Sequence, residues 1–130
     1  MSARNVLTGV RVLVAEDEAL IALDLENALA DLGCAVLGPT PSVARTLALL
    51  AEERPDAALL DLSLMDGWAD PVAEALAAAG VPFALTTGHM PRGLDGPALR
   101  DAPCLAKPFD PEGLRAVMLG LLGTSPPPSS

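Results

Sequence analysis

Five short apolar runs are spaced along this chain, and longer segments with a helical pattern separate them. Each run is four to six residues long and lies next to a polar residue or a turn residue. A strand that is apolar along its whole length must be covered on both faces, as in a parallel sheet with helices on either side. The runs that predict strands cover residues 10–15, 34–37, 57–60, 81–86 and 103–106. The chain is therefore predicted to be an α/β domain with a five-stranded parallel sheet.

Residues at the ends of the intervening segments predict helices. Ser42 and Asp110 are residue types that favour helix N-caps, and Gly33 is typical of the position that follows a helix. The predicted helices cover residues 19–32, 43–53, 70–79 and 91–101, and a last helix begins at residue 111. Glycine and proline interrupt the segment at 91–101, so its helix should be short or frayed. Gly38-Pro39 is expected to end the second strand.

Length and charge restrict the class of protein. The 130 residues suit one domain, and we expect an N-terminal extension at 1–9, a folded domain at 10–123 and a disordered Pro/Ser tail at 124–130. The net charge of −9 argues against binding to a nucleic-acid backbone. The longest uncharged run, residues 75–91, contains glycine and proline and is shorter than the ~20 apolar residues of a membrane span. We expect a cytoplasmic domain without nucleic-acid or membrane partners, in which Cys34 and Cys104 are small buried side chains.

Polar residues stand at the ends of four of the predicted strands. Glu16 and Asp17 follow the first strand, and Asp61 follows the third. Thr87-Gly88 follows the fourth strand, and Lys107-Pro108 follows the fifth. The carboxyl ends of parallel strands meet at one edge of a sheet, where α/β proteins bind ligands. We therefore expect these residues to surround one pocket, although each pattern alone is more often an ordinary turn or helix cap.

The residue types in this predicted pocket indicate phosphoryl transfer. Three carboxylates that meet at one point repel one another unless a cation is present, and oxygen ligands with room for water suit Mg²⁺. A lysine and a hydroxyl beside the metal would suit a dianionic phosphoryl group, which needs positive charge and hydrogen-bond donors. The combination predicts transfer of a phosphoryl group to a carboxylate nucleophile, with Asp61 as the acceptor.

This combination resembles the receiver domains of bacterial two-component response regulators, over residues 10–122. The resemblance implies a flavodoxin-like (βα)5 fold with strand order 2-1-3-4-5, and phosphorylation of Asp61 by a sensor histidine kinase or a phosphotransfer protein. The residues implied to hold Mg²⁺ are Glu16, Asp17, Asp61 and Ser63, the last through its backbone carbonyl. Those implied for the switch and for phosphate contact are Thr87, Gly88, Lys107 and Pro108, and those implied to tune dephosphorylation are Ser63 and His89.

Two segments resemble a subgroup of receivers with a Phe-x-x-x-Thr-Gly signature, and this subgroup is associated with HWE-type histidine kinases. The segments are residues 82–88 and 105–109. Glu16 stands where an aspartate is more usual, so its longer side chain could reach the metal through water. Cys104 occupies a position that is often aromatic, so the usual aromatic swing cannot report phosphorylation. We expect phosphorylation instead to pull Thr87 toward Asp61 and to order or shift residues 91–101.

A small apolar patch is expected on the first helix, where Leu20 and Leu23 face away from the predicted core. Because receivers often dock their kinase through this helix, the resemblance implies that the patch contacts the kinase. The chain is thus predicted to be a single-domain receiver that signals, relays or drains phosphate, as a monomer or weak dimer, and not an enzyme.

Two alternatives remain open. A degenerate receiver would keep the fold and act as an unphosphorylated interaction module, although intact Asp61, Thr87 and Lys107 argue against it. A small phosphatase could use Asp61 as its nucleophile. Such enzymes usually carry the nucleophile after the first strand and need a cap region that this sequence lacks.

Overall fold

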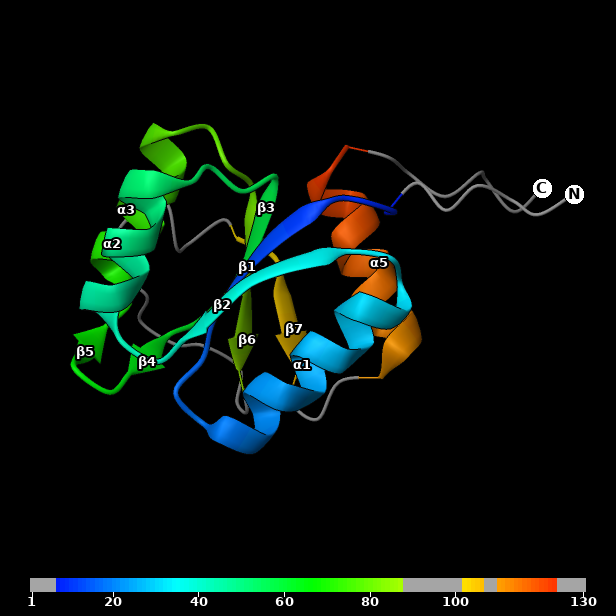
Figure 1. The fold of residues 1–130 in the computed structure, drawn as a ribbon, viewed down its shortest axis with the longest axis horizontal. Coiled ribbons are helices and arrows are strands. Elements are labelled where there is room, and N and C mark those ends of the chain that lie inside the picture. The colour runs from blue at the N-terminus through cyan, green and yellow to red at the C-terminus, as the bar shows by residue number, and fades with distance from the viewer. Residues whose placement is uncertain (1–6, 88–101, 107–109, 124–130) are drawn as a thin grey trace, which may run out of the picture.

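One parallel sheet forms the centre of the computed structural model, which describes residues 7–87, 102–106 and 110–123 (Figure 1). Within these residues five strands pair in the order β2-β1-β3-β6-β7. All four pairings between neighbouring strands are parallel. The strands are β1 (Arg11–Ala15), β2 (Ala35–Thr40), β3 (Ala57–Asp61), β6 (Phe83–Thr87) and β7 (Cys104–Ala106). When only the five strands of this sheet are numbered along the chain, the order is 2-1-3-4-5, as predicted. The predicted flavodoxin-like fold is therefore confirmed.

Helices cover both faces of this sheet. Figure 1 shows α1 (Ala19–Asp31) and α5 (Pro111–Leu121) on one face, and α2 (Val43–Glu52) and α3 (Asp70–Ala78) on the other. The helix predicted at residues 91–101 and the tail predicted at 124–130 lie outside the described residues. Every helix within the described residues is too short or too polar to span a lipid bilayer.

Two apolar layers, one on each side of the sheet, form the core. Successive residues of a strand point to opposite faces, so Val12 and Val14 pack under α1 and α5 while Leu13 packs under α2 and α3. Large, fully buried side chains include Leu25, Leu29, Leu59, Leu114 and Met118 in the first layer, and Leu60, Leu76 and Leu85 in the second. Burying each of these side chains contributes about 1.5–3 kcal/mol, which explains why the central strands are apolar throughout.

The predicted helix ends are confirmed by local hydrogen bonds. Ser42 Oγ accepts the Arg45 N–H at 3.1 Å at the start of α2, and Asp110 Oδ1 accepts the Gly113 N–H at the start of α5. Gly33 follows α1 with a φ of +91°, and a Cβ there would lie 3.0 Å from Thr8 Oγ1. Both the left-handed backbone and this close approach favour glycine at this position.

Three details differ from the sequence-based expectations. The second strand does not end at Gly38-Pro39 but runs through this pair to Thr40. Strand β2 lies at the edge of the sheet, where a residue without an N–H removes no ladder hydrogen bond. Leu7, placed in the predicted N-terminal extension, is fully buried in the core. Cys34 is buried as predicted, but Cys104 is exposed because β7 is the other edge strand.

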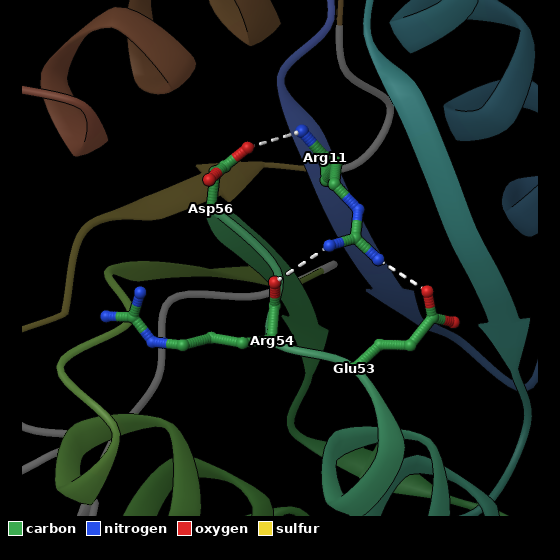
Figure 2. A network of polar contacts seen from close by, with 4 residues as sticks. All are labelled: Arg11, Glu53, Arg54 and Asp56. Carbon is green, nitrogen blue, oxygen red and sulfur yellow. Dashed lines mark hydrogen bonds and ion pairs between the residues drawn. The ribbon is translucent and has the colours of Figure 1, made fainter.

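A polar network fastens the amino-terminal ends of β1 and β3, at the edge of the sheet where these strands begin (Figure 2). Asp56 Oδ2 accepts the backbone N–H of Arg11 at 2.9 Å, and the Arg11 guanidinium donates to Glu53 and to the Arg54 carbonyl oxygen. The Arg54 side chain in turn donates two hydrogen bonds to the Ala79 carbonyl oxygen at the end of α3. This network holds the sheet and the α2–α3 layer together away from the polar strand ends.

Candidate metal centre

Three carboxylates meet where β1 and β3 end. Ala15 pairs with Leu60 across these strands, so Glu16 and Asp61 are the next residues on the two strands. Asp17 follows Glu16. Each of the three side chains offers an oxygen, and these oxygens lie within 4.8 Å of one another. The predicted acidic cluster is therefore confirmed, from two segments that lie more than forty residues apart.

Burial makes this cluster costly without a cation. Glu16 is only 2% exposed, Asp61 is half-buried and Asp17 is exposed. Like charges this close repel one another, and the burial of Glu16 reduces screening by water. Glu16 Oε2 accepts the Glu18 N–H at 3.1 Å, which fixes the direction of its side chain. An all-oxygen donor set in which Asp17 is exposed fits Mg²⁺ or a similar hard cation.

The backbone of Ser63 faces this cluster. Its N–H donates to Asp61 Oδ1 at 3.2 Å. Ser63 lies in a hairpin formed by β4 (Ser63–Leu64) and β5 (Gly67–Trp68), where it pairs with Trp68. The next pair along the hairpin is Leu62 and Ala69, and the Ala69 N–H donates to the Leu62 carbonyl oxygen. Hydrogen-bonded and non-hydrogen-bonded pairs alternate along antiparallel strands, so Ser63 and Trp68 form a non-hydrogen-bonded pair. The Ser63 carbonyl therefore points out of the hairpin, along the edge where its N–H meets Asp61.

The structure describes only part of the remaining predicted site. Asp61 pairs with Thr86, and Thr87 pairs with Ala106, so the backbone of Thr87 lies one position beyond Asp61 at the carboxyl edge of the sheet. Lys107 follows Ala106 directly in the sequence. Gly88, His89, Lys107 and Pro108 lie outside the described residues, as does the side chain of Thr87.

The patch predicted on the first helix is exposed. Leu20 is 78% exposed and Leu23 is 50% exposed, while Leu25 and Leu29 on the opposite side of α1 are fully buried. Both leucines lie in the first two turns of α1, which begins three residues after Glu16. The patch thus lies close in sequence to the acidic cluster.

Sequence reasoning missed Asp66, which connects the hairpin to α2. Its carboxylate accepts the Val43 N–H at 2.6 Å and the Ala44 N–H at 3.1 Å. These two hydrogen bonds lower the pKa of Asp66 below its ordinary value. The one local signal was the Asp66-Gly67 pair, because aspartate followed by glycine is typical of turns. In the structure Gly67 adopts a φ of +142°, which favours glycine. Nothing local in the sequence indicated the partner of the carboxylate.

Comparison with known proteins finds the similar chains and structures in one family. No family model matches the chain. The solution structure of SdrG from Sphingomonas melonis Fr1 is 40% identical, covers 88% of this chain and 97% of that one, and superposes with a TM-score of 0.77. The solution structure of the PhyR response regulator receiver domain from Erythrobacter litoralis is 29% identical, with 95% and 97% coverage and a TM-score of 0.77.

The chain belongs to the response regulator receiver domains of two-component signalling. Its relatives are the PhyR and SdrG receivers. The phyllosphere-induced regulator PhyR of Methylorubrum extorquens is 36% identical over 110 residues, which are 82% of this chain and 41% of that protein. This chain thus spans less than half the length of that PhyR. SdrG has also been solved in a BeF3-activated conformation.

Proposed function

We propose that this receiver domain accepts a phosphoryl group on Asp61 in a Mg²⁺-dependent reaction and changes conformation as a result. The meeting of Glu16, Asp17 and Asp61 within 4.8 Å supports this proposal most directly. Membership in the receiver family and a relative solved in a BeF3-activated conformation support it independently. The donor would be a phosphohistidine on a sensor histidine kinase or a phosphotransfer protein.

The proposed transfer uses the Asp61 carboxylate as the nucleophile. One of its oxygens attacks phosphorus, a P–O bond forms, and the P–N bond to the donor histidine breaks, which leaves the donor imidazole with the bonding electron pair. Glu16, Asp17, Asp61 and the Ser63 carbonyl would hold Mg²⁺. When bound, the metal would offset negative charge on the phosphoryl oxygens. The Ser63 N–H orients the Asp61 carboxylate through its hydrogen bond to Oδ1.

Lys107 and Thr87 would complete the phosphate site in this proposal. A phosphoryl group adds about −1.5 to −2 charges, and an ammonium and a hydroxyl are suitable partners for its oxygens. The pairing of Thr87 with Ala106, which Lys107 follows, supports this arrangement at the level of the backbone. We expect the phosphoryl group to pull Thr87 toward Asp61 and so to order or shift residues 91–101. An NMR comparison with and without a phosphoryl mimic tests that expectation.

Mass spectrometry tests the phosphoacceptor directly. The protein is incubated with acetyl phosphate and Mg²⁺, beside Asp61→Asn and beside Asp56→Asn, which changes a carboxylate at the opposite end of β3. We expect one phosphoryl adduct on the wild type and on Asp56→Asn, no adduct on Asp61→Asn, and none when Mg²⁺ is chelated. An adduct on Asp61→Asn would place the acceptor elsewhere. No adduct on the wild type would favour the unphosphorylated interaction module.

We further propose that the domain is a switch and not an enzyme, that it works in the cytoplasm, and that its kinase is of the HWE type. The Phe-x-x-x-Thr-Gly pattern of residues 83–88 supports the kinase type. Sustained release of phosphate from unrelated phosphate esters would instead support a phosphatase that uses Asp61. Comparing transfer rates from an HWE-type kinase and from a conventional histidine kinase tests the choice of partner.

A further inference from the structure

The hairpin after Asp61 is fixed at its base and anchored in the core. At its base the Ala69 N–H donates to the Leu62 carbonyl oxygen at 2.8 Å. Leu64 is only 4% exposed and packs in the core layer under α2 and α3. Ser63 and Trp68, which pair with each other, are both exposed. The hairpin therefore presents Ser63 outward from a fixed backbone.

The tip of the same hairpin is attached to the start of α2, beside which it lies (Figure 1). Asp66 accepts the N–H groups of Val43 and Ala44 through its two carboxylate oxygens. The Met65 N–H donates to the Pro41 carbonyl oxygen at 3.2 Å. Three hydrogen bonds thus join a two-residue turn to a segment that precedes it by more than twenty residues.

These bonds complete the amino-terminal end of α2. The first N–H groups of a helix have no partner within the helix. In α2 the Val43 and Ala44 groups donate to Asp66, and the Arg45 group donates to Ser42 Oγ. A negative carboxylate is also favoured at this end by the helix dipole. Asp66 is therefore held by geometry and by charge, and an uncharged side chain would hold the hairpin less firmly.

We propose that Asp66 is a positioning residue for the metal site: it fastens the β4–β5 hairpin to α2 and so fixes Ser63 beside Asp61. The inference rests on the proposed function, because it assigns Asp66 a role in the binding of Mg²⁺ through the Ser63 carbonyl. Asp66 does not itself touch the metal, since its two oxygens lie on the first turn of α2. Its effect reaches the site through the short hairpin that ends in the Ser63–Trp68 pair.

A metal titration of Asp66→Ala tests this role, and the chain provides both the optical probe and the matched control. Trp68 is the sole tryptophan and lies opposite Ser63, so its fluorescence reports changes at the hairpin. Asp56→Ala is the control, because Asp56 also accepts a backbone N–H from a distant segment, but at the other end of β3 (Figure 2). Each substitution removes one negative charge and one carboxylate that accepts a backbone N–H from a distant segment. Circular dichroism and urea unfolding without metal establish that the variants fold.

We expect Asp66→Ala to raise the Kd for Mg²⁺ about tenfold, and Asp56→Ala to change it less than about twofold. Asp66→Asn keeps one acceptor oxygen and should raise the Kd by an intermediate factor. If Asp66→Ala does not fold, the Kd of Asp66→Asn is compared with that of the Asp56 variant instead. The rate of phosphorylation by acetyl phosphate should fall in parallel at low Mg²⁺ and recover at saturating Mg²⁺.

The possible outcomes separate this inference from the proposed function. Equal Kd values for the Asp66 and Asp56 variants, with a wild type that binds Mg²⁺ and is phosphorylated, would overturn the positioning role alone. A wild type that neither binds Mg²⁺ nor accepts a phosphoryl group would overturn the proposed function and this inference with it. A loss of Mg²⁺ affinity that is confined to the Asp66 variants would support both.

Discussion

The hydroxyl groups of Thr40 and Thr46 lie 2.7 Å apart inside the protein. Thr40 ends β2, and Thr46 lies in the first turns of α2, so this hydrogen bond joins an edge strand to the helix that covers it. Thr46 Oγ1 donates to the Ser42 carbonyl oxygen at 2.7 Å, so Thr40 Oγ1 is the donor to Thr46. The Val14 carbonyl oxygen lies 3.3 Å from Thr40 Oγ1 and can share the same proton. The site end of β1 is thereby connected to the helix that receives Asp66.

Replacing Thr46 with valine should destabilise the protein. The substitution keeps the shape of the side chain but removes the hydroxyl that meets Thr40 and Ser42. Because Thr46 is fully buried, we expect the free energy of unfolding to fall by about 1–3 kcal/mol. Urea unfolding measures the change. An unchanged free energy would mean that this network contributes nothing.

Replacing Thr86 with valine should instead stabilise the protein. Thr86 is 1% exposed, and its Oγ1 has no hydrogen-bond partner within the part of the chain that the structure describes. A buried hydroxyl without a partner costs about 1–3 kcal/mol, which valine would remove at nearly the same volume. We therefore expect Thr86→Val to raise the free energy of unfolding by about 1 kcal/mol. A loss comparable to that of Thr46→Val would show that the Thr86 hydroxyl has a favourable interaction.

Acid should weaken the attachment of the hairpin to α2. The N–H groups of Val43 and Ala44 lower the pKa of Asp66 below its ordinary value of 3.8. A carboxylate with a lowered pKa in the folded state stabilises it fully above its unfolded pKa, and this contribution is lost as the pH falls through the folded pKa. The stability difference between the wild type and Asp66→Asn should thus be constant near neutral pH and shrink below 3.8. Urea unfolding from about pH 6 to about pH 3 measures it.

Magnesium should raise the melting temperature of the wild type but not of Asp17→Asn. A ligand that binds only the folded state stabilises it by about 2.7 kcal/mol at one hundred times its Kd. Asp17 is exposed, so its substitution should leave the metal-free fold intact. Thermal unfolding with and without Mg²⁺ measures both effects. An equal rise in the variant would remove Asp17 from the proposed ligands.

Truncating the α1 patch should affect transfer from a kinase but not from a small donor. We expect Leu20→Ala with Leu23→Ala to slow phosphorylation by the cognate kinase about tenfold, which corresponds to about 1.4 kcal/mol of lost contact. Phosphorylation by acetyl phosphate should not change. Met65→Ala is the matched control, because Met65 is 70% exposed but lies on the hairpin. An equal loss in that control would place the kinase contact on the hairpin.

Local signals predicted most of the fold because their physical causes are local. Ser42 and Asp110 cap helices through hydrogen bonds to residues three positions away, so the pattern can be read directly from the sequence. The apolar runs predicted the central strands because both faces of those strands are covered. The meeting of Glu16, Asp17 and Asp61 then followed from the parallel arrangement of strand ends.

Features that depend on position within the sheet or on distant partners were not predictable in this way. The passage of β2 through Pro39 and the exposure of Cys104 both depend on which strands form the edges. The bond between Asp66 and Val43 spans 23 residues and leaves no periodic pattern. A two-residue strand such as β4 is also too short for an alternation of apolar and polar residues to identify it.

Pro39 has a consequence for self-association. An exposed edge strand offers unpaired N–H and C=O groups to which a strand of another molecule can add. In β2 the proline supplies no N–H, and the pairing register with β1 shifts near it. Near Pro39 the outer side of β2 is thus a poor template for a continuous intermolecular sheet, because a strand that adds there finds no N–H at this position.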